Sequence, residues 1–167
     1  FSEEGLGTIT VTYGSPYGDL PVVSKRGHTF KGWYTQSGKQ ITPNSEVDIP
    51  EDHVLYAHWT VNTYTLNWDL NGGTAVPGYT TGSVLYGTAI IPPVPTKTGY
   101  DFAGWDKEVE STMPDENLSY RANWIPKSFT VSFNEDGFAS ITVTYDATYG
   151  VLPVPSKTGY IFDGWFT

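Results

Sequence analysis

A phrase of nine residues recurs three times in this chain and constrains its fold more than any other feature. It reads KRGHTFKGW at 25–33, KTGYDFAGW at 97–105 and KTGYIFDGW at 157–165. A catalytic site is usually built once, whereas repeat proteins build the same packing unit many times. The recurrence therefore indicates a string of small, similar units.

The spacing of the copies gives the length of the unit. A shift of 132 residues aligns 1–35 with 133–167 without a gap, and 20 of the 35 positions are identical. A middle copy lies between them, because Trp59 and Trp124 are 65 residues apart. The sequence thus predicts a tandem array of about 65-residue units, with domains at 1–61, 62–126 and 127–167. Unit one lacks the opening of its first strand and unit three its closing part. We therefore expect the protein to continue, or another chain to supply the missing strand.

Short β-strands account for the pattern inside each unit. In 63–68 the side chains of Tyr64, Leu66 and Trp68 alternate with polar residues, which places them on one face of a strand. The segment 128–133 repeats this alternation. The segments 8–13 and 140–145 both contain ITVTY, which predicts a second strand whose alternate residues, Ile9, Val11 and Tyr13 in the first copy, face the core. The segments 55–59 and 120–124 predict the closing strand.

Composition agrees with a mainly β chain. Phe, Tyr and Trp make up 16% of the residues, so a few large rings must build each small core. The 18 glycines and 12 prolines favour strands separated by turns and leave little room for helix beyond one short helical turn in the Pro-bearing crossover. Gly104, the glycine before the tryptophan of the middle copy, is predicted to avoid a collision with the neighbouring element. The short linkers at 60–62 and 125–127 predict that neighbouring repeats touch.

Charge and cysteine content exclude several functions. The formal net charge is −9, and such a surface repels phosphate backbones and anionic lipids. We therefore expect no nucleic-acid partner and no membrane insertion in this segment, which also has no apolar run of about 18 residues. The absence of cysteine rules out disulfides and thiolate metal sites.

The ordered set YTLNWDLNGGT, YG, LPVPSKTGY, FAGW and LYAHW resembles the Listeria–Bacteroides repeat, called the B-repeat in internalin-type surface proteins. The resemblance covers essentially the whole chain. It implies a β-grasp-like, SUMO-like fold, that is, a small α+β unit with little helix. It also implies export from a bacterium and a place in a cell-surface or secreted, extracellular protein. There the array would act as a spacer or stalk, and in adhesion. The middle copy departs from the outer ones at Trp68, where they have Phe1 and Phe133.

A different class of function remains open beside the spacer: a module that binds a surface glycan or a host protein. The hairpins at 36–53 and 106–117 differ between units, and loops on a rigid scaffold commonly carry recognition. The candidate ligand-binding residues are Tyr34, Tyr56 and Tyr79, at positions predicted to face outward or to lie in loops. The tryptophans of the phrase, which could stack on sugars, are predicted to be core because they recur at one framework position. A segment of an enzyme whose catalytic domain lies elsewhere is a third hypothesis.

Other chemistry finds little support in the sequence. No nucleophile motif or phosphate-binding glycine loop is present, which predicts no enzyme activity and no cofactor. His28, His53 and His58 lack a convincing third ligand for a metal. The turns at 69–72 and 134–137 resemble the start of calcium loops, but they lack the later bidentate acid. Lys25, Lys97 and Lys157 recur and could form isopeptide bonds, but no partner can be placed.

Overall fold

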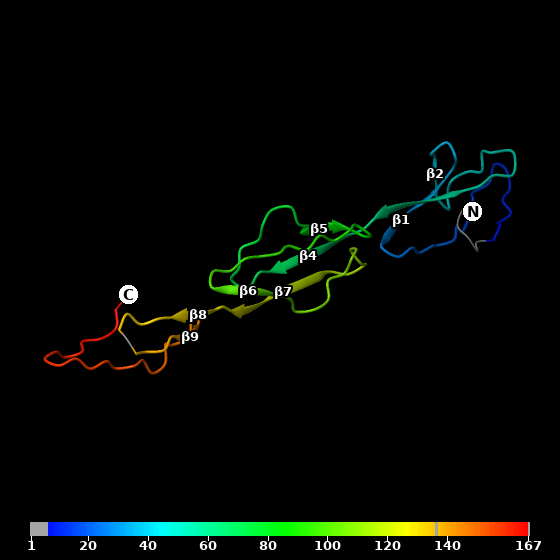
Figure 1. Ribbon diagram of the computed structural model, residues 1–167. Helices are drawn as coiled ribbons and strands as arrows, with labels where there is room; N and C mark the ends of the chain where they lie inside the picture. The colour runs from blue at the N-terminus through cyan, green and yellow to red at the C-terminus, as the bar shows by residue number, and fades with distance from the viewer. Residues whose placement is uncertain (1–6, 136, 167) are drawn as a thin grey trace. The chain divides into compact units, whose positions relative to one another are not determined.

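The computed structural model describes residues 7–135 and 137–166, and the elements in this part of the chain are all strands (Figure 1). The strands are β1 (His28–Tyr34), β2 (Gln40–Ile41), β3 (Tyr56–Val61), β4 (Thr63–Asp69), β5 (Gly82–Leu85), β6 (Tyr100–Trp105), β7 (Leu118–Pro126), β8 (Ser128–Val131) and β9 (Ile141–Thr144). The described residues form no helix, so the prediction of a mainly β chain is confirmed. The predicted helical turn in the crossover is not formed there.

Strand β4 shows why these segments form strands. The side chains of Leu66 and Trp68 are buried and that of Tyr64 is half-buried, whereas the polar residues between them are exposed. An extended backbone turns successive side chains to opposite faces, so the alternation in the sequence becomes one apolar face. The closing strands follow the same rule, since Tyr120 and Ala122 of β7 are buried.

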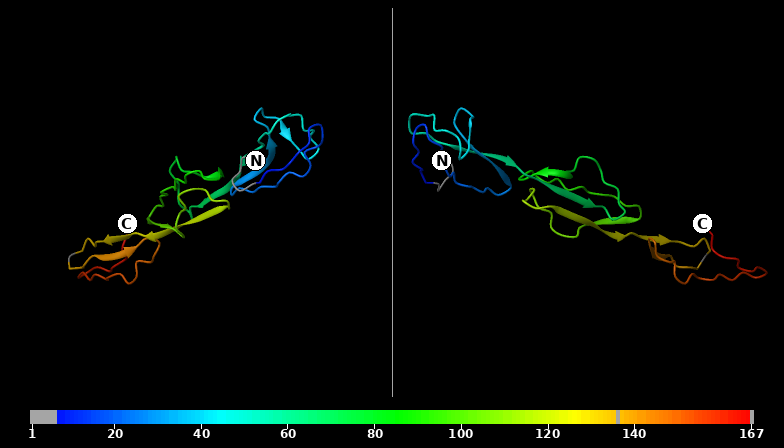
Figure 2. Two further views of the ribbon diagram at one scale, coloured as in Figure 1. Left: turned by 90° about the vertical axis from the view of Figure 1, so that its right-hand side faces the viewer. Right: turned by 180° about the vertical axis from the view of Figure 1, so that it is seen from behind.

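The first sheet has the strand order β2-β1-β3. Strand β1 pairs antiparallel with β3, with Phe30 opposite Trp59 and Tyr34 opposite Tyr56. The pair stays side by side in the views of Figures 1 and 2. On one face of this sheet lies a core of Tyr17, Trp33, Ile41, Val47 and Leu55, against which Val11, Leu20, Val23, Phe30 and Ala57 pack.

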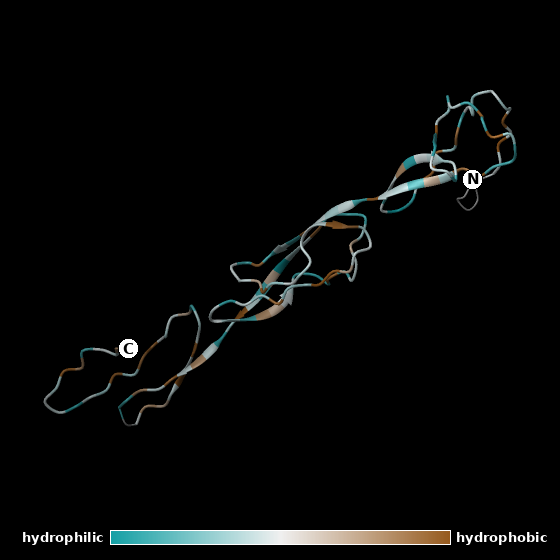
Figure 3. Cartoon of the chain, turned by 90° about the horizontal axis from the view of Figure 1, so that it is seen from above, coloured by the Kyte–Doolittle hydropathy of each residue, from teal (hydrophilic) through white to brown (hydrophobic). Residues whose placement is uncertain are grey.

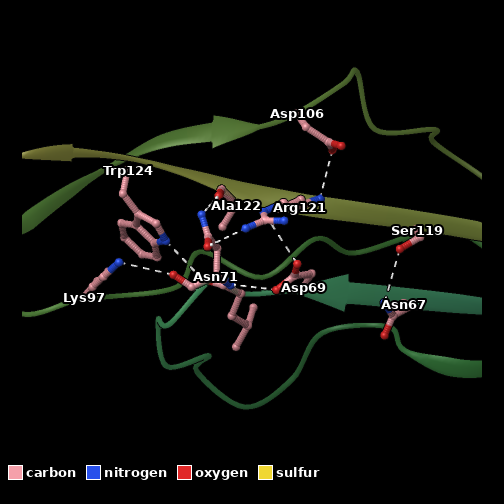
Figure 4. Close-up of polar contacts among 10 residues, drawn as sticks. Asn67, Asp69, Asn71, Lys97, Asp106, Ser119, Arg121, Ala122 and Trp124 are labelled. Atoms are coloured by element: carbon pink, nitrogen blue, oxygen red, sulfur yellow. Dashed lines mark hydrogen bonds and ion pairs between the residues drawn. The ribbon is translucent and has the colours of Figure 1, made fainter.

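The second sheet has the strand order β5-β4-β7-β6 and belongs to the middle repeat. Strands β4 and β5 pair antiparallel, with Tyr64 opposite Val84. Strands β4 and β7 point in the same direction where they lie side by side (Figure 4). In agreement, the backbone N–H of Thr65 donates to Asn117 Oδ1 at 2.7 Å, and Asn67 Nδ2 donates to Ser119 Oγ at 3.2 Å.

Among the described residues, the third sheet contains only β8 and β9, which pair in the same register as β4 and β5. The segment after β9 is irregular and carries apolar residues, drawn brown in Figure 3. Val151 and Ile161 in this segment are 99% and 96% exposed. These apolar side chains are therefore not part of a core formed by the described residues.

A β-bulge explains the glycine before the recurring tryptophan in the first and middle repeats. The register between β6 and β7 shifts between Phe102 and Trp105, and Gly104 has φ of +97°. A Cβ on Gly104 would meet no described atom within 4 Å. The predicted collision is therefore wrong. Glycine is favoured because the backbone is left-handed at the bulge, a conformation that side chains with a Cβ disfavour.

Two compact units are defined by contacts, and the division runs through the middle repeat. The first comprises the chain up to Asn67 with Tyr79–Ile91 and Glu110–Ser119, and the second comprises Trp68–Gly78, Pro92–Val109 and the chain from Tyr120 on. Each unit therefore combines one outer repeat with part of the middle repeat. The predicted domain borders fall between β3 and β4 and between β7 and β8, and their role as borders of independent domains stays a prediction.

Candidate functional site

The junction between the first and middle repeats is built around Gly27 and Tyr86. Gly27 is buried, has φ of +69°, and presents its Cα to the face of the Tyr86 ring. A Cβ at this position would lie 2.1 Å from Tyr86 Cγ, closer than real Cβ contacts come. The imidazole of His28 meets the same ring edge-on, with ring centres 5.8 Å apart. Only glycine leaves room for this contact.

Backbone hydrogen bonds hold the glycine and the tyrosine in place through one linker residue. The N–H of Asn62 donates to the carbonyl oxygen of Gly27 at 2.9 Å. The N–H of Tyr86 then donates to the carbonyl oxygen of Asn62 at 2.9 Å. Because all four groups belong to the main chain, this connection does not depend on the side chain of the linker residue.

The junction between the middle and third repeats has the same construction. A Cβ on Gly99, which has φ of +78°, would lie 2.4 Å from the ring of Tyr145, and Tyr100 meets that ring edge-on at 5.5 Å. The N–H of Lys127 donates to the Gly99 oxygen at 2.8 Å, and the N–H of Tyr145 donates to the Lys127 oxygen at 2.8 Å. Linker residues of different chemistry, Asn62 and Lys127, thus occupy equivalent places.

The side-chain pairs beside the two junctions differ. Arg26 donates to Asp115 Oδ1 through Nε at 2.8 Å and Nη2 at 2.5 Å, and this bond holds the pKa of Asp115 below its ordinary value. At the second junction the Tyr100 hydroxyl donates to Asp146 Oδ2 at 2.8 Å, which raises the pKa of Tyr100. Exposed pairs of this kind contribute little stability. Shape, rather than charge, is the feature that the junctions share.

Gly159 and Tyr13 hold the sequence positions of this glycine and this tyrosine in the outer repeats. A Cβ on Gly159 would meet no described atom within 4 Å, although its φ is +81°. Tyr13 is 66% exposed. Tyr13 was predicted to face its own core, and this is wrong, because the equivalent Tyr86 and Tyr145 pack on the glycine of the preceding repeat instead.

Sequence reasoning missed Tyr86 and Tyr145 as junction residues. The alternation in ITVTY places the tyrosine on the core face, and nothing local indicates a contact with another repeat. A signal was nevertheless present, because a Gly followed by an aromatic ring and a Tyr that ends the second strand both recur once per repeat. These two recurring features, which a single core does not require, indicate a contact between repeats.

Two of the three predicted ligand-binding tyrosines come together in the structure. Tyr34 of β1 lies opposite Tyr56 of β3, and the Tyr34 ring stacks on His58 with centres 3.9 Å apart and planes 13° apart. Tyr56 is 37% exposed and Tyr34 is half-buried. Tyr79 lies elsewhere, between β4 and β5 of the middle repeat. A binding role for these three residues stays a prediction.

The tryptophans are packed rather than presented to solvent. None of the six is exposed: Trp33 and Trp68 are buried, and Trp59, Trp105, Trp124 and Trp165 are half-buried. The indole Nε1 of Trp33 donates to the carbonyl oxygen of Pro21 at 2.8 Å, and that of Trp165 donates to Pro153 at 2.8 Å. The recurring phrase is therefore a packing device.

The turn at 69–72 is held by protein hydrogen bonds (Figure 4). The N–H of Asn71, at φ of +50°, donates to Asp69 Oδ1, and Asn71 Nδ2 donates to the oxygen of Ala122. Two cationic side chains also reach Asn71: Arg121 donates to its Oδ1 at 3.0 Å and Lys97 to its backbone oxygen at 3.2 Å. The similar turn at 134–137 includes Asp136, which lies outside the described residues.

The remaining histidine, His53, is engaged in the first core. Its Nδ1 donates to the carbonyl oxygen of Glu51, so Nε2 accepts from the Tyr17 hydroxyl at 2.6 Å. Within 7–135 and 137–166, no three His, Asp or Glu side chains cluster as they would around a metal ion. No helix long and apolar enough to span a membrane occurs in the same residues.

Comparison with known proteins places the chain among repeat proteins. The family model described as the Listeria-Bacteroides repeat domain matches residues 2–58, 64–122 and 129–167. Two proteins of Evansella cellulosilytica, named "Putative membrane protein" and "Putative Gly-rich membrane protein", are each 33% identical to this chain over 85% and 95% of its length. Internalin H of Listeria monocytogenes is 40% identical over 49% of the chain.

The chain covers only 23%, 20% and 15% of these three relatives, respectively. No solved structure matched the chain. The β-grasp assignment therefore stays a prediction from resemblance. The three matched segments leave few residues outside the family pattern, and this chain belongs to the Listeria-Bacteroides repeat domain family.

Proposed function

We propose that this chain is a non-enzymatic repeat segment of a bacterial cell-surface or secreted protein, in which it acts as a spacer or stalk and contributes to adhesion. The observation that carries the proposal is the Gly–Tyr contact, which recurs at Gly27–Tyr86 and Gly99–Tyr145 with the same backbone relay. Neighbouring repeats are then each other's partners. A spacer needs such a contact, because a linker without one lets neighbouring domains move freely.

A distance measurement tests the spacer role. The chain has no cysteine, so Ser24→Cys and Ser156→Cys give two unique sites for spin labels. Both serines are exposed and occupy the same position in the first and third repeats. We expect one narrow distribution of label-to-label distances. A broad distribution in the otherwise unaltered chain would contradict a spacer of set length.

An extracellular location is supported by the names of two relatives, which call them membrane proteins, and by the similarity to internalin H. An antibody raised against this chain should bind intact cells of the source bacterium, or the chain should be found in its culture medium. Binding only after the cells are permeabilised would contradict the proposed location.

A second candidate function is the binding of a glycan or a host protein. It is favoured by the ring group of Tyr34, Tyr56 and His58, which lies at the base of the variable hairpin 36–53. Partly exposed aromatic faces of this kind suit a sugar ring or an aromatic side chain. Specificity would reside in the hairpins 36–53 and 106–117.

A panel of bacterial and host glycans tests this alternative. A ligand that binds the unaltered chain should lose affinity with Tyr56→Ala and keep it with Tyr13→Ala, because both tyrosines are exposed but only Tyr56 belongs to the ring group. Equal losses in the two variants would argue against this site.

A further inference from the structure

The chain enters and leaves the middle repeat on two neighbouring strands. It arrives from the first repeat into β4 and departs towards the third repeat from β7, and these strands are adjacent in the order β5-β4-β7-β6. Both point in the same direction (Figure 4). The start of β4 at Thr63 and the end of β7 at Pro126 therefore lie at opposite ends of the pair. Tension along the chain would slide β4 along β7 instead of opening the pair from one end.

The row of contacts between β4 and β7, here called the seam, has to break before this repeat can be stretched. Strand β4 could leave alone or together with β5, and β7 could leave alone or together with β6, but β4 and β7 part in every case. Sliding loads all the bonds of the seam at the same time, whereas peeling from one end loads them one after another. Because forced unfolding is governed by the barrier to unfolding, the seam sets the force that this repeat withstands.

Side chains reinforce the first half of the seam. The backbone N–H of Thr65 donates to Asn117 Oδ1 at 2.7 Å. Asn67 Nδ2 donates to Ser119 Oγ at 3.2 Å. All four residues are exposed, so they lie on the face of the sheet opposite the apolar core. These hydrogen bonds therefore add to the packing of the buried face.

Side chains also reinforce the second half of the seam (Figure 4). The guanidinium of Arg121 lies 3.6 Å from the carboxylate of Asp69 and donates to Asn71 Oδ1 at 3.0 Å. Asn71 Nδ2 in turn donates to the carbonyl oxygen of Ala122 at 3.1 Å. Every second position from 65 to 71 is thus tied to β7 or to the residue just before it.

We propose that the seam between β4 and β7 is a mechanical clamp, which lets the repeat transmit tension between its neighbours without unfolding. One at a time, exposed contacts of this kind add little to equilibrium stability. When the strands slide, the contacts are loaded together and their resistances add. Their effect therefore appears in the force that the repeat withstands along the chain direction. This inference rests on the proposed stalk function, since only a stalk fixed at one end is pulled in this way.

Single-molecule pulling on the full chain tests the clamp. The chain has no cysteine, so Thr60→Cys and Ser128→Cys give two unique, exposed attachment points just outside β4 and β7. Thr60→Cys with Thr88→Cys instead pulls on adjacent ends of β4 and β5, because Thr63 lies opposite Leu85. At the same loading rate we expect the first rupture to need at least twofold more force with the first pair of attachment points. Equal forces for the two pairs would overturn the proposal.

A variant at Asn71 locates the clamp. Asn71→Gly removes two contacts of the seam and suits the left-handed backbone, since Asn71 has φ of +50°. It should lower the rupture force by at least a fifth between attachment points 60 and 128 and leave it unchanged between 60 and 88. Asn123→Ala is the matched control, because Asn123 is an exposed asparagine of β7 outside the contacts described. A loss of force in both pulling directions, or an equal loss with Asn123→Ala, would overturn the clamp.

The results also separate the clamp from the spacer role. One narrow distribution of label-to-label distances together with equal rupture forces in the two directions would keep the spacer and overturn the clamp. A broad distribution together with a rupture force that depends on direction would support the clamp and contradict a spacer of set length.

Discussion

The ring of Tyr145 lies against Gly99 with no room for a methyl group between them. The same relationship between Tyr86 and Gly27 means that a repeat recognises its successor by shape. The polar groups around the two contacts differ, with an Arg–Asp pair at one and a Tyr–Asp pair at the other. Side-chain charge can therefore vary at a junction while the Gly–Tyr contact stays the same.

The first prediction concerns this glycine. Gly99→Ala should cost about 1–2 kcal/mol for the left-handed backbone and a further ~1–3 kcal/mol for the clash with Tyr145. Gly159→Ala is the matched control, because Gly159 has φ of +81° but an open Cβ position. Urea denaturation should therefore show a clearly larger loss for Gly99→Ala. Equal losses would mean that the ring moves aside and that the contact carries no energy.

The second prediction concerns the ring. Tyr145→Ala should uncouple the third repeat from the middle one, because it removes the side chain that fills the junction. Hydrogen exchange in β8 and β9 should accelerate while exchange in β1 and β3 stays unchanged. Tyr13→Ala, at a position that is 66% exposed, should change stability by less than about 0.5 kcal/mol. Unaltered exchange in β8 and β9 would refute the coupling.

The third prediction concerns the effect of low pH on the Arg26–Asp115 pair. The hydrogen bond from Arg26 lowers the pKa of Asp115 in the folded chain, so the folded state binds the Asp115 proton more weakly than the unfolded state does. The stabilisation is present above the unfolded pKa, about 3.9, and is lost as the pH falls through the lower folded pKa. Carboxyl NMR should show Asp115 titrating below the ordinary pKa of an aspartate, about 3.9. With Arg26→Gln the midpoint of Asp115 should rise towards that value. A midpoint that stays low in this variant would assign the shift to another cause.

The fourth prediction concerns the core of the middle repeat. Leu66 is 1% exposed, and Leu66→Ala should cost about 2–5 kcal/mol because it leaves a cavity. Leu85, on the neighbouring strand, is 49% exposed, so Leu85→Ala should cost much less. Thermal unfolding followed by tryptophan fluorescence compares the two. Similar losses would mean that β4 does not supply the core.

Patterns within one segment predicted most of the fold. The alternation of Tyr64, Leu66 and Trp68 fixed the buried face of β4, and Tyr120 was placed correctly in the closing strand of the middle repeat. Leu55 is buried as expected, but it precedes the closing strand of the first repeat, which begins at Tyr56. Predictions failed for residues whose role depends on a partner far away in the sequence. Gly104 needed a bulge, which depends on the register with β7. The packing of the Tyr145 ring depends on Gly99, which lies 46 positions earlier in the sequence.

The sequence predicted only part of the candidate site. The sequence gives reason to expect short linkers and touching repeats, but it does not say which side chains touch. The segment 9–12 shows the limit most clearly, since it has no regular secondary structure although the same ITVT forms a strand at 141–144. Strand formation requires a hydrogen-bonding neighbour, and a local pattern does not report one.

The Gly–Tyr junction also bears on how such a gene can change in length. A repeat of the middle kind carries a tyrosine that fits the glycine before it and a glycine that fits the tyrosine after it. Duplication of the DNA for one such repeat therefore brings both halves of each new contact, and no compensating mutation is needed. The number of copies can drift by recombination while every joint in the protein stays matched.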